Sequence, residues 1–275
     1  YNTVISHDQG TNYVIRIRDE LDATIEDWSD GPFWLIGGMR LTQPNGGERW
    51  YVGDTNLVTW QSPSFPDLGS PAMLWISYDG ATNWVEITSS SQRPTNAVGL
   101  NSYRWLTASN RADFISETAR MGVTPLGAAD PLPHPPATFY GDTSDQTFTL
   151  AGLAVLFPTA TNAVRMNSDV AIRWVGAGVG SAGVKVEFFD GTKWTTLAEA
   201  APHMGRVTEY MTQLTAAAPT EAARIRLMSN ADPKVWAISD PFILADINIV
   251  SPVGGGAGTR DKWQIGTTNY VRWTA

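Results

Sequence analysis

The sequence predicts an all-β chain of tandem antiparallel β-sandwiches, and three observations lead to this prediction. One skeleton of residues occurs three times, short alternating apolar runs recur between turn residues, and charged residues make up only 17% of the 275 positions. Alternating runs bounded by Gly, Asn, Asp and Pro are typical of short strands joined by turns. The length allows one to three domains with a substantial core.

The repeated skeleton runs from a proline to a tryptophan. Its first copy is LTQPNGGERWYVGDTNLVTW at 41–60, its second is AVLFPTATNAVRMNSDVAIRW at 154–174, and its third, at 247–273, begins INIVSP and ends YVRW. Proline and tryptophan are 16 residues apart in the first two copies and 21 in the third, which carries a Gly-rich insertion. We predict that the shared tryptophan is a packed core residue of each sandwich. These residues are Trp60, Trp174 and Trp273.

The spacing of the copies predicts the domain boundaries. Pro44 and Pro158 are 114 residues apart and Pro158 and Pro252 are 94 apart, so the first complete copy holds an insertion. Five prolines between 124 and 142 cannot sustain a helix or an interior strand, which predicts an extended surface loop there. The predicted organisation is the C-terminal strands of a preceding module (1–37), a module with a Pro-rich insertion at 124–142 (38–151), a second module (152–245) and the first strands of a following module (246–275).

Each complete copy also contains a predicted hairpin. Asp79-Gly80 and Asp190-Gly191 lie between alternating apolar runs, and Asp-Gly favours a tight turn that needs positive φ angles. With the hairpin, each repeat holds about six to eight short strands in roughly 100 residues, the size of an immunoglobulin-like, or fibronectin III-like, sandwich.

These motifs carry a resemblance to known proteins. PNGGE at 44–48, followed by Trp50, Gly53 and Trp60 and by a hairpin closed by Trp84, resembles the immunoglobulin-like modules repeated in large secreted or cell-surface bacterial proteins. It is also similar to the N-terminal domain of the fungal Kre9/Knh1 cell-wall family. The resemblance implies an extracellular or cell-surface location and a non-catalytic spacing or assembling role. The fungal alternative would place the protein near β-glucan, but the chain has no Ser/Thr-rich stalk.

Composition argues against several classes of partner. A net charge of −8 without a basic patch argues against a nucleic-acid partner. The absence of cysteine excludes disulfides and thiolate zinc sites. No apolar run reaches the ~20 residues of a membrane span, and we expect either a removed leader or an internal piece of a longer chain.

The sequence contains no pattern that identifies a catalytic site. Gly178 to Gly183 fits the G-x-G-x-x-G pattern, but a strand follows it where a dinucleotide fold needs a helix, which predicts a flexible loop. His7, His134 and His203 lie in predicted loops without a nucleophile motif or a second metal ligand nearby, so we expect solvent-exposed histidines. We therefore expect neither an enzyme nor a resident cofactor.

Two binding alternatives stay open. Calcium takes six to eight oxygen ligands, and an acidic loop offers five carboxylates, although a solvated loop is the simpler interpretation. Trp28, Trp34, Trp75 and Trp84 would suggest sugar binding if two or three lay exposed on one face. The candidate calcium ligands of the loop are Asp19, Asp22, Glu26 and Asp27, and its fifth acidic residue is Glu20.

The sequence thus favours a non-catalytic structural segment of a long extracellular protein. Such a rod of modules would serve assembly, as in a surface layer, sheath or filament, or adhesion. Its expected partners are other copies or neighbouring modules, and a cell-wall or extracellular glycan is a second possibility. The alternative is an accessory, carbohydrate-binding region of a secreted polysaccharide-degrading enzyme.

Overall fold

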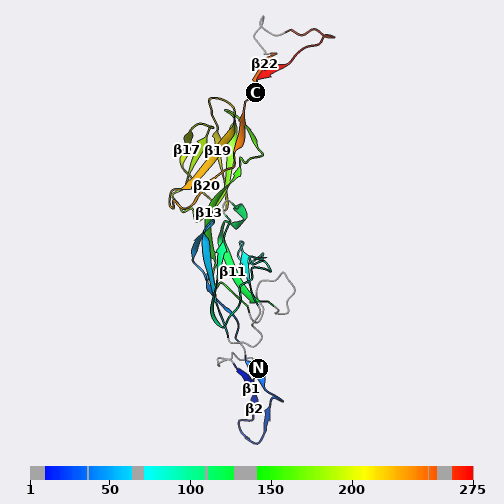
Figure 1. The fold of residues 1–275 in the computed structure, drawn as a ribbon, viewed down its shortest axis with the longest axis vertical. Helices are drawn as coiled ribbons and strands as arrows, with labels where there is room; N and C mark the ends of the chain where they lie inside the picture. Colours follow the sequence, from blue (N-terminus) through cyan, green and yellow to red (C-terminus); the bar gives the residue numbers. More distant parts are fainter. Residues whose placement is uncertain are drawn as a thin grey trace. The chain divides into compact units, whose positions relative to one another are not determined.

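The computed structural model describes residues 10–35, 37–63, 71–108, 111–126, 141–246, 248–252 and 262–274, and these residues form an all-β protein (Figure 1). They fall into two compact units. Unit 1 comprises Tyr1–Glu48, Thr55–Leu106 and Thr118–Phe148, and unit 2 comprises Arg49–Asp54, Thr107–Glu117 and Thr149–Ala275. The module boundaries predicted from the repeat spacing stay a prediction. In the described part of the chain, no helix is long and apolar enough to cross a membrane.

Unit 1 contains an antiparallel sandwich. One sheet has the order β10–β7–β5, and the other has the order β11–β8–β9 with β12 paired to β11. The strands are β5 (Arg40–Gln43), β7 (Thr55–Ser62), β8 (Ala72–Ser77), β9 (Val85–Glu86), β10 (Gly99–Leu106), β11 (Ser116–Pro125) and β12 (Asp142–Thr143). Strand β7 shows why the sequence folds this way, because Val58, Trp60 and Ser62 alternate inward while their neighbours lie at the surface.

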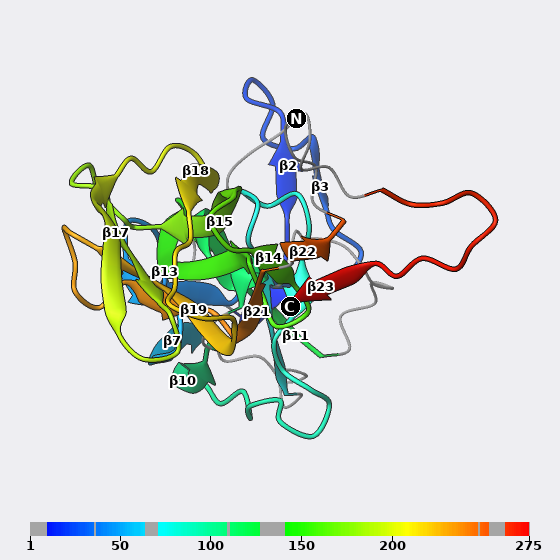
Figure 2. The ribbon, with the colours of Figure 1, turned by 90° about the horizontal axis from the view of Figure 1, so that it is seen from above.

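Unit 2 contains a second sandwich with the same strand plan. One sheet has the order β18–β15–β13, and the other has the order β14–β21–β19–β16–β17 with β20 paired to β19. Figure 2 shows β18 beside β15, and β19 close to β21. The strands are β13 (Phe148–Phe157), β14 (Ala163–Arg165), β15 (Asp169–Ala177), β16 (Val184–Phe189), β17 (Trp194–Ala201), β18 (Val207–Gln213), β19 (Thr220–Ser229), β20 (Trp236–Ile238) and β21 (Phe242–Ala245).

The pairing pattern of unit 2 identifies the sandwich as immunoglobulin-like. The long strands of the two sheets pair antiparallel, and the short strand β14 pairs with the last strand of the sandwich, β21, in parallel. The two sheets enclose one core of apolar side chains, which includes Trp174, Phe188, Ile225 and Phe242. The predicted all-β fold of tandem immunoglobulin-like sandwiches is therefore confirmed.

A second parallel pair in unit 2 repeats this geometry. Strand β6 (Arg49–Tyr51) lies parallel to the start of β13, with Tyr51 opposite Ala151. The backbone N–H of Val52 donates to Ala151 O at 2.9 Å, as that of Met166 donates to Ala245 O at 2.8 Å. The peptide bonds before the three repeated prolines, Pro44, Pro158 and Pro252, are all cis.

The end regions form small sheets. Strands β1 (Gly10–Tyr13) and β4 (Phe33–Leu35) pair, as do β2 (Arg16–Arg18) and β3 (Glu26–Trp28), and β22 (Asn248–Ser251) lies beside β23 (Arg272–Thr274). The prediction that Trp273 is a packed core residue is wrong for this structure, because its side chain is 62% exposed. The β22–β23 pair has no further strand in its sheet among the described residues, so nothing there buries the indole.

The Pro-rich insertion is described only at its two ends. Pro125 ends β11 opposite Ala72 in β8, and Asp142 pairs with Val123 through β12. The predicted surface loop between them, residues 127–140, lies outside the described residues.

Candidate functional site

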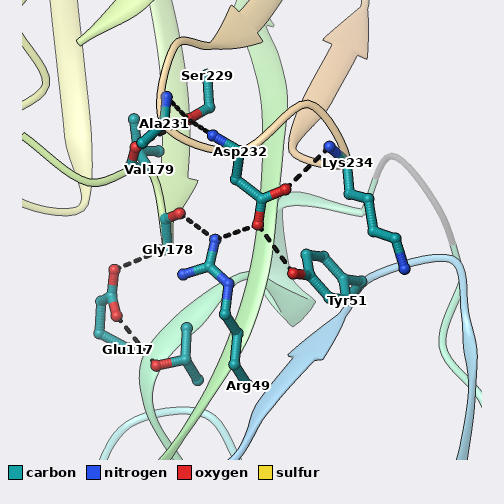
Figure 3. A network of polar contacts seen from close by, with 10 residues as sticks. Arg49, Tyr51, Glu117, Gly178, Val179, Ser229, Ala231, Asp232 and Lys234 are labelled. Carbon is teal, nitrogen blue, oxygen red and sulfur yellow. Dashed lines mark hydrogen bonds and ion pairs between the residues drawn. The ribbon is translucent and has the colours of Figure 1, made fainter. Parts of the chain in front are cut away.

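The most extensive polar cluster described in unit 2 is centred on Asp232. Its Oδ2 accepts hydrogen bonds from Arg49 Nη2 and from the Tyr51 hydroxyl, both at 2.8 Å, and its Oδ1 accepts the Lys234 backbone N–H at 3.0 Å (Figure 3). The Lys234 ammonium also lies 4.9 Å from the centre of the Tyr51 ring. Strand β6 supplies Arg49 and Tyr51, and the turn between β19 and β20 supplies the other two residues.

The cluster continues onto the loop after β15 through the peptide groups of Gly178. The Gly178 N–H donates to Glu117 Oε1, and its carbonyl accepts from Arg49 Nη2 (Figure 3). Gly178 has a φ of +64°, and an added Cβ would lie 2.7 Å from Ala151 Cβ. Only glycine fits this position without displacement, because both the backbone angle and the space exclude a side chain.

Apolar contacts accompany these polar ones. Ile115, which follows the 3-10 turn η1 (Ala112–Phe114), is fully buried in a small cluster with Ala154, Val175 and Ala177. Val52 and Ala112 pack against the same cluster. The segments 49–54 and 107–117 are therefore fixed to the outside of strands β13 and β15 by burial as well as by hydrogen bonds.

The contacts within the cluster favour the charged forms of Arg49 and Asp232. Burial lowers the pKa of Arg49, but its contacts with Tyr51 and Asp232 outweigh this and hold the pKa above its usual value. Burial raises the pKa of Asp232, but the Tyr51 hydroxyl, the Lys234 N–H and Arg49 together hold it below its usual value. General acid–base catalysis needs a group that titrates near the working pH. This arrangement is suited to cross-linking segments of chain, not to proton transfer.

The glycine-rich loop lies between two strands, β15 and β16, as its sequence context predicts. It holds no helix, so the dinucleotide pattern has no phosphate site there. The flexibility of this loop stays a prediction, although Glu117 and Arg49 bind the N–H and the carbonyl of Gly178.

The tryptophans that end the repeated skeleton in the two complete copies, Trp60 and Trp174, are fully buried, and each of these indole N–H groups has a side-chain acceptor. Trp60 Nε1 donates to Asn96 Oδ1 at 2.9 Å, and Trp174 Nε1 donates to His203 Nδ1 at 3.2 Å. The prediction of an exposed histidine is therefore wrong for His203, which is half-buried against Gly176. Burial lowers the pKa of His203, against smaller opposing effects of the Gly176 carbonyl and Glu117. His7 and His134 lie outside the described residues.

Both predicted Asp-Gly hairpins are present. Gly80 and Gly191 have φ angles of +76° and +94°, in the turns between β8 and β9 and between β16 and β17. The Asp79 carboxylate accepts the backbone and side-chain N–H groups of Asn83, which lower the pKa of Asp79 to about 2. The hydroxyl and N–H of Thr192 and the N–H of Lys193 lower the pKa of Asp190 to about 2 in the same way. Both carboxylates brace their own turns.

The acidic loop of the proposed calcium site has local hydrogen bonds. Asp19 Oδ1 accepts two backbone N–H groups, and Asp22 Oδ1 accepts the N–H and hydroxyl of Thr24. Glu26 lies 3.9 Å from Arg16 across the β2–β3 pair, and Asp27 is exposed. Within the described ranges, no three His, Cys, Asp or Glu residues are grouped as a metal site. Calcium binding stays a prediction.

The aromatic side chains proposed for sugar binding are not gathered in the described residues. Trp28 is 49% exposed beneath Arg16, whereas Trp75 is buried and donates to Thr124 Oγ1 at 3.0 Å. Trp84 is half-buried, and the side chain of Trp34 lies outside the description.

Sequence reasoning missed the Arg49–Asp232 cluster. Arg49 and Asp232 are 183 positions apart, and neither belongs to a motif that points to the other. The one residue of the cluster that belongs to a sequence motif is Gly178, and its G-x-G-x-x-G pattern does not predict the contacts of its peptide groups.

Comparison with known proteins shows a similarity of fold and no similarity of sequence that identifies a family. No protein-family model matches the chain, and no curated protein matches it. Among solved structures, it is similar to an ICAM-5 D1–D4 ectodomain fragment at 12% identity and a TM-score of 0.25. The match covers 87% of this chain and 63% of that fragment. A TM-score this low carries no argument about function.

Proposed function

We propose that this chain is a non-catalytic structural segment of a longer extracellular or cell-surface protein, whose immunoglobulin-like modules serve assembly or adhesion. The observation that supports it most is the Asp232 cluster. Its donors and acceptors bind one another, and its carboxylate and guanidinium keep their charges near neutral pH. Such a cluster holds strands and loops in place.

The proposed extracellular or cell-surface location is inferred from the immunoglobulin-like sandwich fold. Many cell-surface domains share the two-sheet sandwich without sequence similarity. The resemblance to modules of secreted bacterial proteins points the same way, and the fungal cell-wall resemblance stays a prediction. A surface location would expose these modules to other copies of the protein and to extracellular glycan.

One observation keeps the carbohydrate-binding alternative open. Trp236 in β20 is 55% exposed and offers an indole face on which a sugar ring could stack. Against it, the ring of Trp194 in the same sheet is covered by the Arg226 guanidinium at 4.2 Å and contacted by Phe189. One open indole in this sheet is a weak platform for a polysaccharide.

Electron microscopy and glycan retention separate the two functions. The structural proposal expects ordered multi-copy assemblies of the purified chain and no retention on insoluble glycans. Retention on cellulose, chitin or β-glucan that is lost in Trp236→Ala but kept in Trp28→Ala would instead support the carbohydrate-binding function.

A further inference from the structure

Strand β10 is a regular edge strand. It pairs only with β7 among the described strands, and the register runs without a shift through eight residues, from Gly99 opposite Ser62 to Leu106 opposite Thr55. An edge strand offers backbone N–H and C=O groups to a further strand. Proteins usually protect such edges with bulges, prolines, short lengths or charges.

The β10 edge has few of these protections. It is eight residues long, and it contains no proline, no carboxylate and one charge, Arg104. Its outward side chains include Leu100, 69% exposed, and Leu106, 66% exposed. Leu57 on β7 is 45% exposed and lies opposite Arg104, beside Leu106 on the same face. The outer face of this edge therefore exposes two leucines, separated by Ser102 and Arg104, and no described strand pairs with its free side.

The β10 sequence is complementary to itself in an antiparallel register. With Tyr103 opposite Tyr103 of a second copy, Leu100 lies opposite Leu106 and Leu106 opposite Leu100. Arg104 then lies opposite the neutral Ser102, and the two arginines are only diagonal neighbours. This two-fold pairing buries both leucine pairs and places no like charges directly opposite each other.

Other long edge strands of the described chain are less suited to the same contact. In β18, the register that places Val207 opposite Met211 also places Glu209 opposite Glu209 of the second copy, which is repulsive, and the register centred on Tyr210 places Met211 opposite Glu209. Strand β17 has two shifts in its register with β16, which mark bulges. Of these three edges, β10 is the one whose exposed apolar residues can lie opposite each other without like charges opposite, although the net charge of −8 opposes any contact between copies.

We propose that β10 is the contact through which two copies of this chain associate, by antiparallel edge pairing centred on Tyr103. The inference rests on the proposed assembly function and specifies its contact. It commits to a second copy as the partner, because the strand's own pattern supplies both sides of the pairing.

Cysteine pairing tests this register in the full chain. The protein has no cysteine, so L100C and L106C each carry a single thiol. Both leucines are exposed, so neither substitution disturbs the core. Opposite residues of paired strands have Cα atoms about 4.5–5.5 Å apart, within the range that a disulfide spans. The matched control is V85C, whose side chain is 55% exposed on another strand.

Under mild oxidation, an equimolar mixture of L100C and L106C should form at least about tenfold more cross-linked dimer than either variant alone, because pairing raises the effective thiol concentration. Equal cross-linking in the mixture and in the single variants, or in a mixture of L100C with V85C, overturns the proposal. Wild-type chain that self-associates without this selective cross-link rejects the β10 contact and leaves the proposed function standing. Wild-type chain that stays monomeric at every concentration rejects the β10 contact and the assembly role, and leaves adhesion as the proposed function.

Discussion

Removal of the Asp232 carboxylate is the most direct perturbation of the polar cluster in unit 2. Asp232→Ala deletes the acceptor of the Tyr51 hydroxyl, the Arg49 guanidinium and the Lys234 N–H. The ion pair is partly exposed, with side-chain exposures of 38% for Arg49 and 19% for Asp232, so it contributes only about 0.5–1 kcal/mol. The Tyr51 and Lys234 hydrogen bonds contribute about 1 kcal/mol each. We expect a total loss of about 2–3 kcal/mol in the free energy of unfolding.

Urea denaturation followed by tryptophan fluorescence measures this loss, and Asp113→Ala is the matched control. Asp113 pairs with Arg111, but both side chains are more than half exposed, so this substitution should cost less than about 0.5 kcal/mol. Amide exchange should rise at Lys234 in Asp232→Ala, because the Lys234 N–H loses its acceptor, Asp232 Oδ1. Equal losses in the two variants, or unchanged exchange at Lys234, would refute the reasoning.

Two further predictions concern single sites in unit 2. Because burial holds the pKa of His203 below the value of 6.5 expected for the unfolded chain, its contribution to stability is complete above that pH and falls as the pH drops towards the folded pKa. His203→Asn, which copies the acceptor that Asn96 provides to Trp60, should remove this slope below about pH 6.5 in pH-dependent urea denaturation. An unchanged slope would count against this assignment. Gly178→Ala should lower the free energy of unfolding by about 2–4 kcal/mol, from a positive φ and a steric clash, whereas Gly47→Ala, with a positive φ but open space, should cost about 1 kcal/mol. Similar losses in the two glycine variants would show that the clash is relieved by relaxation.

The local features of the fold were predictable from the sequence. Asp-Gly between alternating runs predicts a hairpin because the turn residues and the strand period are both local. The proline-to-tryptophan spacing placed Trp60 and Trp174 on strands whose inward face forms a core, and both are fully buried. Trp273 follows the same spacing, but its burial depends on strands that must pack over it, and spacing alone does not supply them.

The non-local contacts were not predictable in this way. The parallel pairing of β6 with β13 and the contact of Arg49 with Asp232 join segments that are about 100 and 183 positions apart. No residue pattern within either segment identifies its partner, because hydrogen-bond complementarity is decided only when the chain is folded. His203 was missed for a related reason, since a buried indole requires some acceptor and the sequence does not say which side chain provides it.

The central claim, that this chain is a structural segment that associates with its own copies, is tested most directly by sedimentation equilibrium of the wild-type chain over a wide concentration range. The account predicts an average mass that rises from one chain to two or more as the concentration increases, and a Leu100→Lys variant that shifts this rise to higher concentration. The mass of a single chain at every concentration would contradict it.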